Sequence, residues 1–243
     1  MAVIRKYAGA FSGPYVSTLP IYAPLYLPSL GVDTYSYRWR SSFLSGADGS
    51  AVTSWSSTSD DAVLASSGSA PVISRIGTLP VATFDGAANK LSLASMPAYK
   101  SLVVVFKLLD NATTAGGILS STDSDFSFFG DNANGLTTSC TGSGTTTVTA
   151  VDRTKWHVAV MVNDPITEKL KLEVDGVVGG GAGPTPADIA ITSLVLGYTA
   201  AGGNGNVQIA EVATYAQALT SAQRASVRAA VKAATDYSVL ALP

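Results

Sequence analysis

The fold is decided by the stretch Gly205-Asn206-Val207-Gln208-Ile209-Ala210-Glu211-Val212-Ala213-Thr214-Tyr215 and by the segment Ala218-Leu219-Thr220-Ser221-Ala222-Gln223-Arg224 that follows it. The first stretch alternates as a half-buried strand does, and the residues predicted to share one face are Val207, Ile209, Ala213 and Tyr215, with Glu211 among them. The second predicts the start of a helix, because Thr220 has Gln223 three residues after it, as in a capping box. We therefore expect a long strand that completes the sheets formed by earlier residues and leads into one amphipathic helix over about 221–235.

The composition indicates one large folded domain with a nearly neutral surface. The chain has 243 residues, of which 47% are hydrophobic and 13% charged, which is enough apolar material for a full core. The net charge of -2 provides no basic patch to follow a phosphate backbone, so nucleic acid is not an expected partner. Cys140 is the single cysteine, which excludes an internal disulfide, and we expect it to be semi-buried and structural. Membrane insertion is not expected, because no apolar run reaches the roughly 18–20 residues that cross a bilayer.

From residue 45 onward the pattern predicts an all-β domain of short strands. Alternating or continuously apolar segments bounded by turn residues indicate strands at 51–55, 80–86, 91–93, 102–106, 116–119, 126–129, 146–148, 156–162, 170–174, 177–178 and 193–197. The segment 102–106 is apolar at every position, which predicts a central strand covered on both faces. Residues 56–69 are expected to form a polar loop. In the helix, Arg224, Arg228 and Lys232 recur every four residues and are predicted to face solvent.

Residues 1–44 differ from the rest and are predicted to form an extended arm. They contain six of the ten Tyr and four of the eleven Pro, and prolines at this spacing disfavour both helix and central strand. Such an arm either wraps its own domain or docks on a neighbouring subunit. We favour docking, because tyrosine is enriched at protein interfaces and an extended arm cannot bury itself. The predicted assembly contacts are Tyr7, Tyr15, Tyr22 and Tyr26, and the sandwich domain is expected to span 45–243.

Three segments in this order resemble the concanavalin A-like (laminin-G-like) jelly-roll family of lectins and glucanases. The first runs from Asp48-Gly49-Ser50 through Trp55 to Pro80-Val81-Ala82-Thr83-Phe84-Asp85-Gly86, the second joins Lys155-Trp156-His157 to Leu172-Glu173-Val174-Asp175-Gly176, and the third is the closing strand and helix quoted above. The resemblance covers roughly residues 45–238 and implies a jelly-roll β-sandwich with one C-terminal helix. Domains with this closing motif are common in bacteriophage and prophage structural proteins, so the resemblance also implies a virion context. It does not by itself imply an activity.

The resemblance to glucanases does not extend to their catalytic residues. Those enzymes have a Glu-x-Asp-x-(x)-Glu strand, whose two glutamates must lie about 5 Å apart for retaining hydrolysis. The glutamates of this chain are Glu168, Glu173 and Glu211, and Glu173-Val174-Asp175 begins the pattern without a second Glu after it. We therefore predict no catalytic residue.

Glu211 and His157 are predicted to be structural residues. Glu211 shares a face with apolar side chains, so its carboxylate is either a tuned acid or, as we favour, an acceptor for backbone N–H groups of a neighbouring loop. His157 is the single histidine, which excludes a multi-histidine metal site. Its strand neighbours Ala159 and Met161 favour a packed side chain.

One oxygen-rich region is the candidate binding site. Carboxylate and amide oxygens that suit either a sugar or Ca²⁺ come from Asp123, Asp125, Asp131, Asn132 and Asn134. Their spacing is not that of an EF-hand loop. Turn formation by Asp, Asn and Gly explains the same residues, and we favour this interpretation. No cofactor other than this Ca²⁺ is expected.

These observations lead to a functional hypothesis. We expect a non-enzymatic bacteriophage virion protein, on the tail or the head surface, whose arm binds other virion proteins or copies of itself and whose lectin-like domain binds host glycans. It is expected to be made in the host cytoplasm, because the N-terminal segment lacks the apolar region of a signal peptide. The alternatives are a free carbohydrate-binding lectin with a dispensable arm and, less favoured, a divergent glycan-degrading enzyme.

Overall fold

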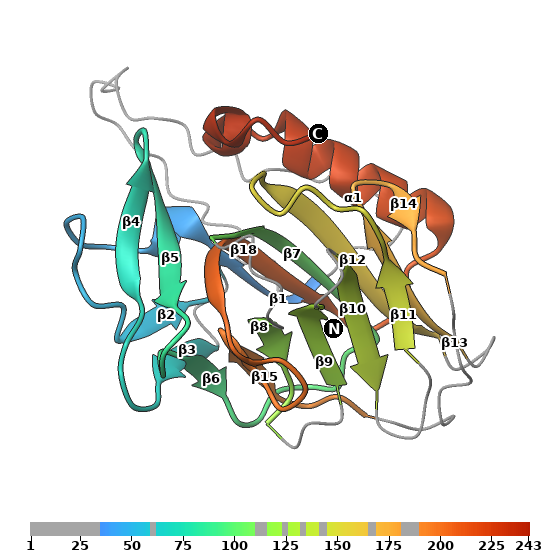
Figure 1. Ribbon diagram of the computed structural model, residues 1–243, viewed down its shortest axis with the longest axis horizontal. Coiled ribbons are helices and arrows are strands. Elements are labelled where there is room, and N and C mark those ends of the chain that lie inside the picture. Colours follow the sequence, from blue (N-terminus) through green and yellow to red (C-terminus); the bar gives the residue numbers. More distant parts are fainter. Residues whose placement is uncertain are drawn as a thin grey trace, which may run out of the picture.

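The computed structural model describes residues 35–58, 62–109, 116–122, 126–131, 135–140, 145–164, 169–180 and 190–243. Over these residues the chain forms two large antiparallel β-sheets that pack face to face, with a C-terminal helix on the outside (Figure 1). The expected all-β sandwich with a late helix is therefore confirmed. Within these ranges, no helix has the length and apolar character needed to cross a membrane.

The first sheet contains the stretch that decides the fold. Its order is β14–β13–β12–β7–β18–β5–β4, and β1 pairs with the second half of β18, whose first half pairs with β5. The bounds are β1 Tyr35–Arg40, β4 Val72–Ile76, β5 Leu79–Asp85, β7 Ser101–Leu108, β12 His157–Asp164, β13 Lys169–Val174, β14 Val177–Val178 and β18 Asn206–Tyr215. The predicted central strand is β7, which pairs with β12 and β18 and is buried on both faces, as expected.

The second sheet has the order β11–β10–β9–β8–β15–β6–β3–β2. Its bounds are β2 Ser54–Ser56, β3 Val63–Ser66, β6 Leu91–Leu93, β8 Gly116–Ser120, β9 Phe126–Gly130, β10 Leu136–Cys140, β11 Thr145–Val148 and β15 Leu194–Leu196. A small hairpin of β16, Tyr198–Thr199, and β17, Gly203–Asn204, follows β15. β3 lies inside the segment predicted to be a polar loop. The prediction missed it because Leu64 is its one fully buried side chain, too little to give a period.

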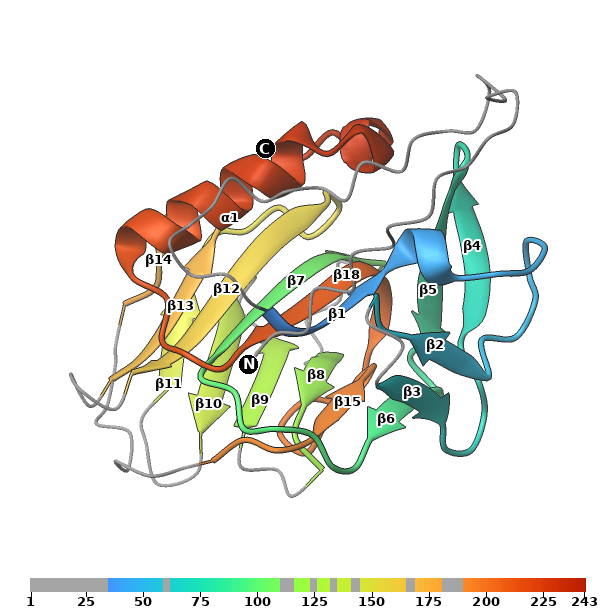
Figure 2. The same ribbon diagram turned by 180° about the vertical axis from the view of Figure 1, so that it is seen from behind.

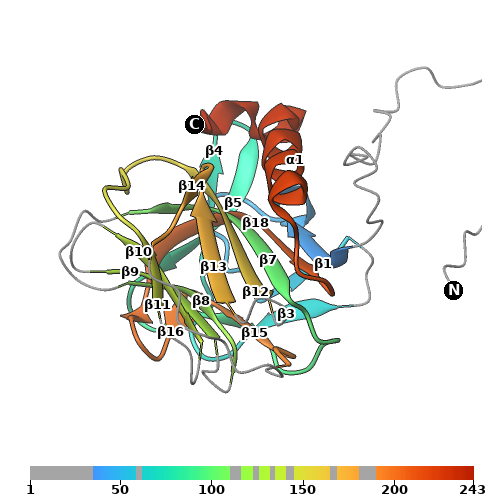
Figure 3. The ribbon, with the colours of Figure 1, turned by 90° about the vertical axis from the view of Figure 1, so that its right-hand side faces the viewer.

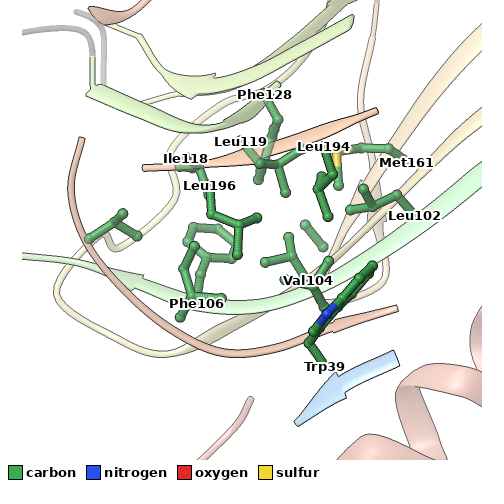
Figure 4. Packing of buried hydrophobic residues seen from close by; sticks show 14 of the residues in the cluster. Trp39, Leu102, Val104, Phe106, Ile118, Leu119, Phe128, Met161, Leu194 and Leu196 are labelled. Carbon is green, nitrogen blue, oxygen red and sulfur yellow. The ribbon is translucent and has the colours of Figure 1, made fainter. Parts of the chain in front are cut away.

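Alternate residues of the two sheets enclose an apolar core. Phe106 of the first sheet and Phe128 of the second meet edge to face, with ring centroids 5.4 Å apart, and both are completely buried (Figure 4). Each such side chain contributes roughly 1.5–3 kcal/mol by leaving water. Figure 4 shows the surrounding side chains of Trp39, Leu102, Val104, Ile118, Leu119, Met161, Leu194 and Leu196. Cys140 is buried in the same core, which is compatible with the structural role expected for it.

The outer face of the first sheet is covered by α1, Ser221–Ala233, and by the 3₁₀-helix η2, Thr235–Leu240 (Figure 3). Thr220 Oγ1 accepts from Gln223 N and Gln223 Oε1 accepts from Thr220 N, so the predicted capping box is confirmed. We call the apolar surface beneath these helices the covered face; the sheet residues in it are Leu79, Val81, Val103, Val105, Val158, Val160, Val162, Ala210, Ala213 and Tyr215. The prediction missed η2, which is too short for a helical period to be recognised.

A bulge in β18 corrects one prediction. Ala210 is an extra residue relative to β7. Before it, Val207 and Ile209 face the core between the sheets, whereas Ala213 and Tyr215, after it, belong to the covered face. The expectation that these four residues share one side of the strand was wrong, because one inserted residue moves every later side chain to the opposite side.

The sandwich begins earlier than predicted. β1 belongs to the first sheet, where it lies beside β18 (Figure 2). Trp39 within it is completely buried. Residues 35–44 therefore belong to the sandwich, and the expected boundary after residue 44 lies too late in the chain. The Tyr and Pro composition of residues 1–44 led to the prediction of one extended arm, whereas the structure pairs both arginines of β1 with carboxylates. The predicted arm contacts Tyr7, Tyr15, Tyr22 and Tyr26 lie outside the described residues.

Candidate functional site

The outer face of the second sheet is lined with hydroxyl groups. In the register of β9, β10 and β11, Phe129 lies opposite Thr137 and Thr137 opposite Thr147, so these three side chains point the same way. A parallel row two residues along consists of Ser127, Ser139 and Thr145. We call these six residues the hydroxyl face. Phe129 and Thr147 are half-buried, so solutes reach part of this face.

The β16–β17 hairpin and the residues around it cover the adjoining strand β8. Gly117 and Gly205 meet backbone to backbone there, since a Cβ added to Gly205 would lie 1.7 Å from the Gly117 carbonyl oxygen. Gly202 packs beside Phe129, where an added Cβ would lie 2.9 Å from the Phe129 Cβ. Ser120 Oγ donates to the Tyr198 carbonyl at 2.9 Å and ties the hairpin to β8. The hairpin thus forms a wall at one side of the hydroxyl face.

Asp131 directly follows β9, and its side chain is hydrogen-bonded to the row Phe129–Thr137–Thr147 through Thr137. Its Oδ1 accepts from Gly135 N at 2.8 Å and its Oδ2 from Thr137 Oγ1 at 3.1 Å. Thr137 Oγ1 is in turn 2.9 Å from Thr147 Oγ1. Asp131 therefore shapes the turn after β9, as favoured, and its carboxylate also orders the hydroxyl face. The other predicted binding residues, Asp123, Asp125, Asn132 and Asn134, lie outside the described residues.

The hydroxyl face itself was not predicted from the sequence. The signal was present in the alternation of 136–140 and 145–148, where Thr and Ser take the positions that an exposed strand face would have. The pairing of these segments with β9 brings Phe129 into the same row. Arg153, which is buried against Asp131, was missed as well, because its contacts lie about twenty residues earlier in the chain.

His157 is buried and structural in its packing, as predicted. Its ring lies 5.8 Å from the ring of Phe106, measured between centroids. Nδ1 is 2.5 Å from Asp175 Oδ2 and Nε2 is 2.7 Å from the Asp152 carbonyl oxygen. Asp175 Oδ1 also accepts from Val158 N at 2.9 Å. Asp175 and Gly176 both have positive φ and form the predicted two-residue turn between β13 and β14.

Glu211 has side-chain partners, which corrects the prediction that it accepts from the backbone of a loop. Arg38 Nε donates to Glu211 Oε1 at 2.6 Å, and the Tyr237 hydroxyl donates to Oε2. Arg40 lies 3.9 Å from the same carboxylate and pairs with Asp236. Burial, followed by the charge of Glu211, raises the pKa of Tyr237 above its ordinary value. This carboxylate therefore fixes η2 and β1 to β18.

Glu173 performs the same task for α1. Arg224 Nε donates to Glu173 Oε2 at 2.8 Å, and Arg228 Nη1 donates to Oε1. Arg224 is buried and Arg228 half-buried, so the prediction that both face solvent was wrong. The four-residue spacing suggested a solvent-exposed face of the helix. It instead places two guanidinium groups over one buried carboxylate.

The two buried glutamates cannot form a retaining pair. Register across the first sheet places Glu173 opposite Val160, then Val103, then Ala213, two residues from Glu211 in β18. Three strand spacings amount to roughly 14 Å, far beyond the separation of about 5 Å that retaining hydrolysis needs. Glu168 lies outside the described residues. In the ranges that the structure describes, no three His, Cys, Asp or Glu side chains gather as metal ligands would.

Comparison with known proteins shows the fold. No family model and no curated protein sequence matches this chain. Among solved structures, Trypanosoma rangeli sialidase with the inhibitor DANA has a TM-score of 0.60 at 12% identity, covering 80% of this chain and 32% of the sialidase. The binding domain of botulinum neurotoxin serotype D/C has a TM-score of 0.61 at 9% identity, covering 83% of this chain and 53% of that domain.

A third neighbour, the receptor binding domain of botulinum neurotoxin type G, has a TM-score of 0.57 at 10% identity and covers 81% of this chain. The chain spans about a third of the sialidase and about half of the neurotoxin domains. At these identities the likeness establishes a shared β-sandwich fold and nothing finer.

Proposed function

We propose that this protein is a non-enzymatic, lectin-like binding domain that recognises a glycan through its hydroxyl face. The observation that supports this is the row Phe129–Thr137–Thr147, which Asp131 orders by hydrogen bonding at one end. A half-buried aromatic ring offers apolar contact to the C–H face of a sugar, and the neighbouring hydroxyls donate to or accept from its hydroxyl groups. The opposite outer face of the sandwich is occupied by α1 and η2.

The solved neighbours support a glycan or a cell-surface receptor as the ligand class. The sialidase was determined in complex with sialic acid, and the neurotoxin domain is a receptor binding domain. We carry over only the general use of this sandwich to present a binding surface, because each neighbour is a longer protein of low identity. Glu173 and Glu211, the glutamates closest to the glucanase pattern, are both neutralised by buried arginines, which favours binding without cleavage.

The test is a printed array of bacterial and mammalian glycans, sialylated sugars included, probed with the full chain. We expect binding to a restricted set of glycans, and Phe129→Ala to lower the affinity for the best of them by about tenfold. Val177→Ala is the matched control, because Val177 is an exposed apolar residue on β14 of the first sheet. Absence of binding across the array would contradict the proposal, and release of free sugar from the bound glycans would contradict its non-enzymatic part.

We further propose that the domain is displayed on a bacteriophage particle, on the tail or the head surface, and that residues 1–34 attach it to other virion proteins or to copies of itself. The support is the Tyr/Pro composition of that segment and the resemblance of the closing strand and helix to phage structural proteins. A free lectin is the alternative.

The structure shows where to truncate the chain in order to distinguish a virion-anchored domain from a free lectin. Removing residues 1–44 would delete β1, and with it Trp39 and the Arg38–Glu211 ion pair. A chain starting at Tyr35 keeps the whole described sandwich. We expect this chain to bind the same glycan as the full chain and to fail to enter the particle; incorporation at the wild-type level would contradict the anchoring proposal.

A further inference from the structure

We propose that Arg153 and His157 form a buried brace that positions Asp131 and the hydroxyl face for glycan binding. This inference rests on the proposed function, which it deepens by naming the residues that hold the binding surface in shape. Neither side chain belongs to the hydroxyl face. Both lie behind it, at 3% and 4% exposure, so they act through Asp131 as positioning residues.

Arg153 fastens both ends of the turn after β9. Its Nη2 donates to the carbonyl oxygen of Asp131 and, at 2.7 Å, to that of Gly135. The same nitrogen lies 3.5 Å from Asp131 Oδ1, so the guanidinium also neutralises the carboxylate that binds Thr137. Gly130 makes room for this arrangement, because a Cβ there would lie 3.3 Å from Arg153 Cζ. Two backbone carbonyls and one carboxylate therefore converge on one buried cation.

His157 fixes the segment that carries Arg153. Its Nε2 faces the carbonyl oxygen of Asp152, the residue directly before Arg153. Its Nδ1 faces Asp175 in the turn between β13 and β14, and Asp175 is itself held by Val158 N. A continuous path of hydrogen bonds and one peptide unit thus runs from the Asp175 turn to Asp131 and on to Thr137 and Thr147.

The brace depends on both ring nitrogens of His157. The carboxylate of Asp175 and the carbonyl oxygen of Asp152 can only accept a hydrogen bond, so each contact is made when the ring nitrogen that faces it donates. A side chain without two nitrogens at this spacing therefore cannot replace both contacts.

The test uses the full chain and two readouts, hydrogen exchange of the amides of residues 135–137 and affinity for the strongest glycan of the array. We expect Arg153→Gln to speed hydrogen exchange and to weaken glycan binding by about tenfold. Arg153→Lys should recover part of both, because lysine keeps the positive charge but lacks the planar set of N–H donors of the guanidinium. Arg75→Gln is the matched control. Arg75 also donates to two carbonyls, those of Thr78 and Gly46, but it is exposed on the first sheet, so both readouts should stay unchanged.

A variant of His157 tests the other half of the brace. We expect His157→Gln to speed exchange at residues 135–137 and to weaken glycan binding, as Arg153→Gln does. Unchanged exchange at residues 135–137 in His157→Gln, or in both Arg153 variants, would overturn the brace. If the wild type binds no glycan, the proposed function fails while the exchange measurement still decides whether the brace orders the turn.

Discussion

The two outer faces of this sandwich come from the same architecture and have opposite chemistry. On the first sheet, the outward positions of β12 are Val158, Val160 and Val162; α1 packs on this strand and η2 packs on β5. On the second sheet, the outward positions of β10 are Thr137 and Ser139, and a small hairpin covers the adjoining strand β8. Alternation along a strand lets one residue in two determine each outer face without disturbing the core. The first sheet uses its outer face for folding, whereas on the outer face of the second sheet Thr137 is buried, Phe129 and Thr147 are half-buried and Thr145 is exposed.

The covered face should be far more sensitive to the loss of a charge than the surface at its edge. Glu211→Ala leaves the Arg38 guanidinium buried without its partner, so we expect the free energy of unfolding to fall by about 3–5 kcal/mol. Asp236→Ala, which removes an exposed partner of Arg40, should cost under about 1 kcal/mol. Denaturant unfolding of the two variants checks this. Equal losses would mean that Glu211 is not the anchor of the covered face.

The wall of the hydroxyl face should be equally intolerant of a single methyl group. Gly205→Ala places a Cβ against the Gly117 carbonyl oxygen, and backbone on both sides prevents easy relaxation. We expect a loss of about 3 kcal/mol, measured by thermal or denaturant unfolding. At Gly180 an added Cβ meets no atom within 4 Å, so Gly180→Ala should be tolerated. A stable Gly205→Ala variant would show that the hairpin does not pack on β8 as described.

Sequence analysis predicted the features that are local and failed where a partner lies far along the chain. The capping box at Thr220 and the buried strand β7 are local patterns, and both are confirmed. Arg224 was predicted to face solvent and Arg38 to lie in the arm, because their partners, Glu173 and Glu211, are 51 and 173 residues away. Long-range pairing converts an apparently polar segment into a buried one, and periodicity contains no information about it.

The prediction for the two faces of β18 failed for a different reason. No Gly or Pro marks Ala210, so the sequence gives no sign that the alternation changes phase there. For the candidate site, Asp131 was chosen for its oxygens, and the structure adds that its carboxylate orders Thr137. The hydroxyl face could not be recognised before the pairing of β9, β10 and β11 was known, because its rows run across strands and not along them.

Placing a hydroxyl on the covered face and an apolar side chain on the hydroxyl face tests directly whether the two outer faces have different roles. Val160→Thr buries a hydroxyl beneath the helices, and we expect it to lower stability by about 1–3 kcal/mol. The mirror substitution Thr147→Val removes the contact with Thr137 at a half-buried position, so its cost in stability should be under about 1 kcal/mol. Only Thr147→Val should reduce glycan affinity. Unfolding and binding measurements on both variants would contradict the contrast if the two costs were reversed.

The smallest effect concerns Tyr215, the buried tyrosine of the covered face, and appears only at alkaline pH. Burial raises the pKa of Tyr215 above its ordinary value of about 10, so above that pH the unfolded chain releases a proton that the folded chain retains. The stabilisation from this difference is fully present below about pH 10 and is lost as pH rises toward the folded pKa.

Tyr215→Phe removes that linkage while preserving the ring. We expect wild type and variant to have similar stability near pH 7 and the variant to be the more stable of the two above about pH 10. Tyr237→Phe is unsuitable for this purpose, because it also removes the hydrogen bond to Glu211. Melting temperatures measured across the alkaline range decide the question. Parallel curves for wild type and Tyr215→Phe would show that water reaches the Tyr215 hydroxyl, and that the helices cover this end of the first sheet less completely than its register and burial imply.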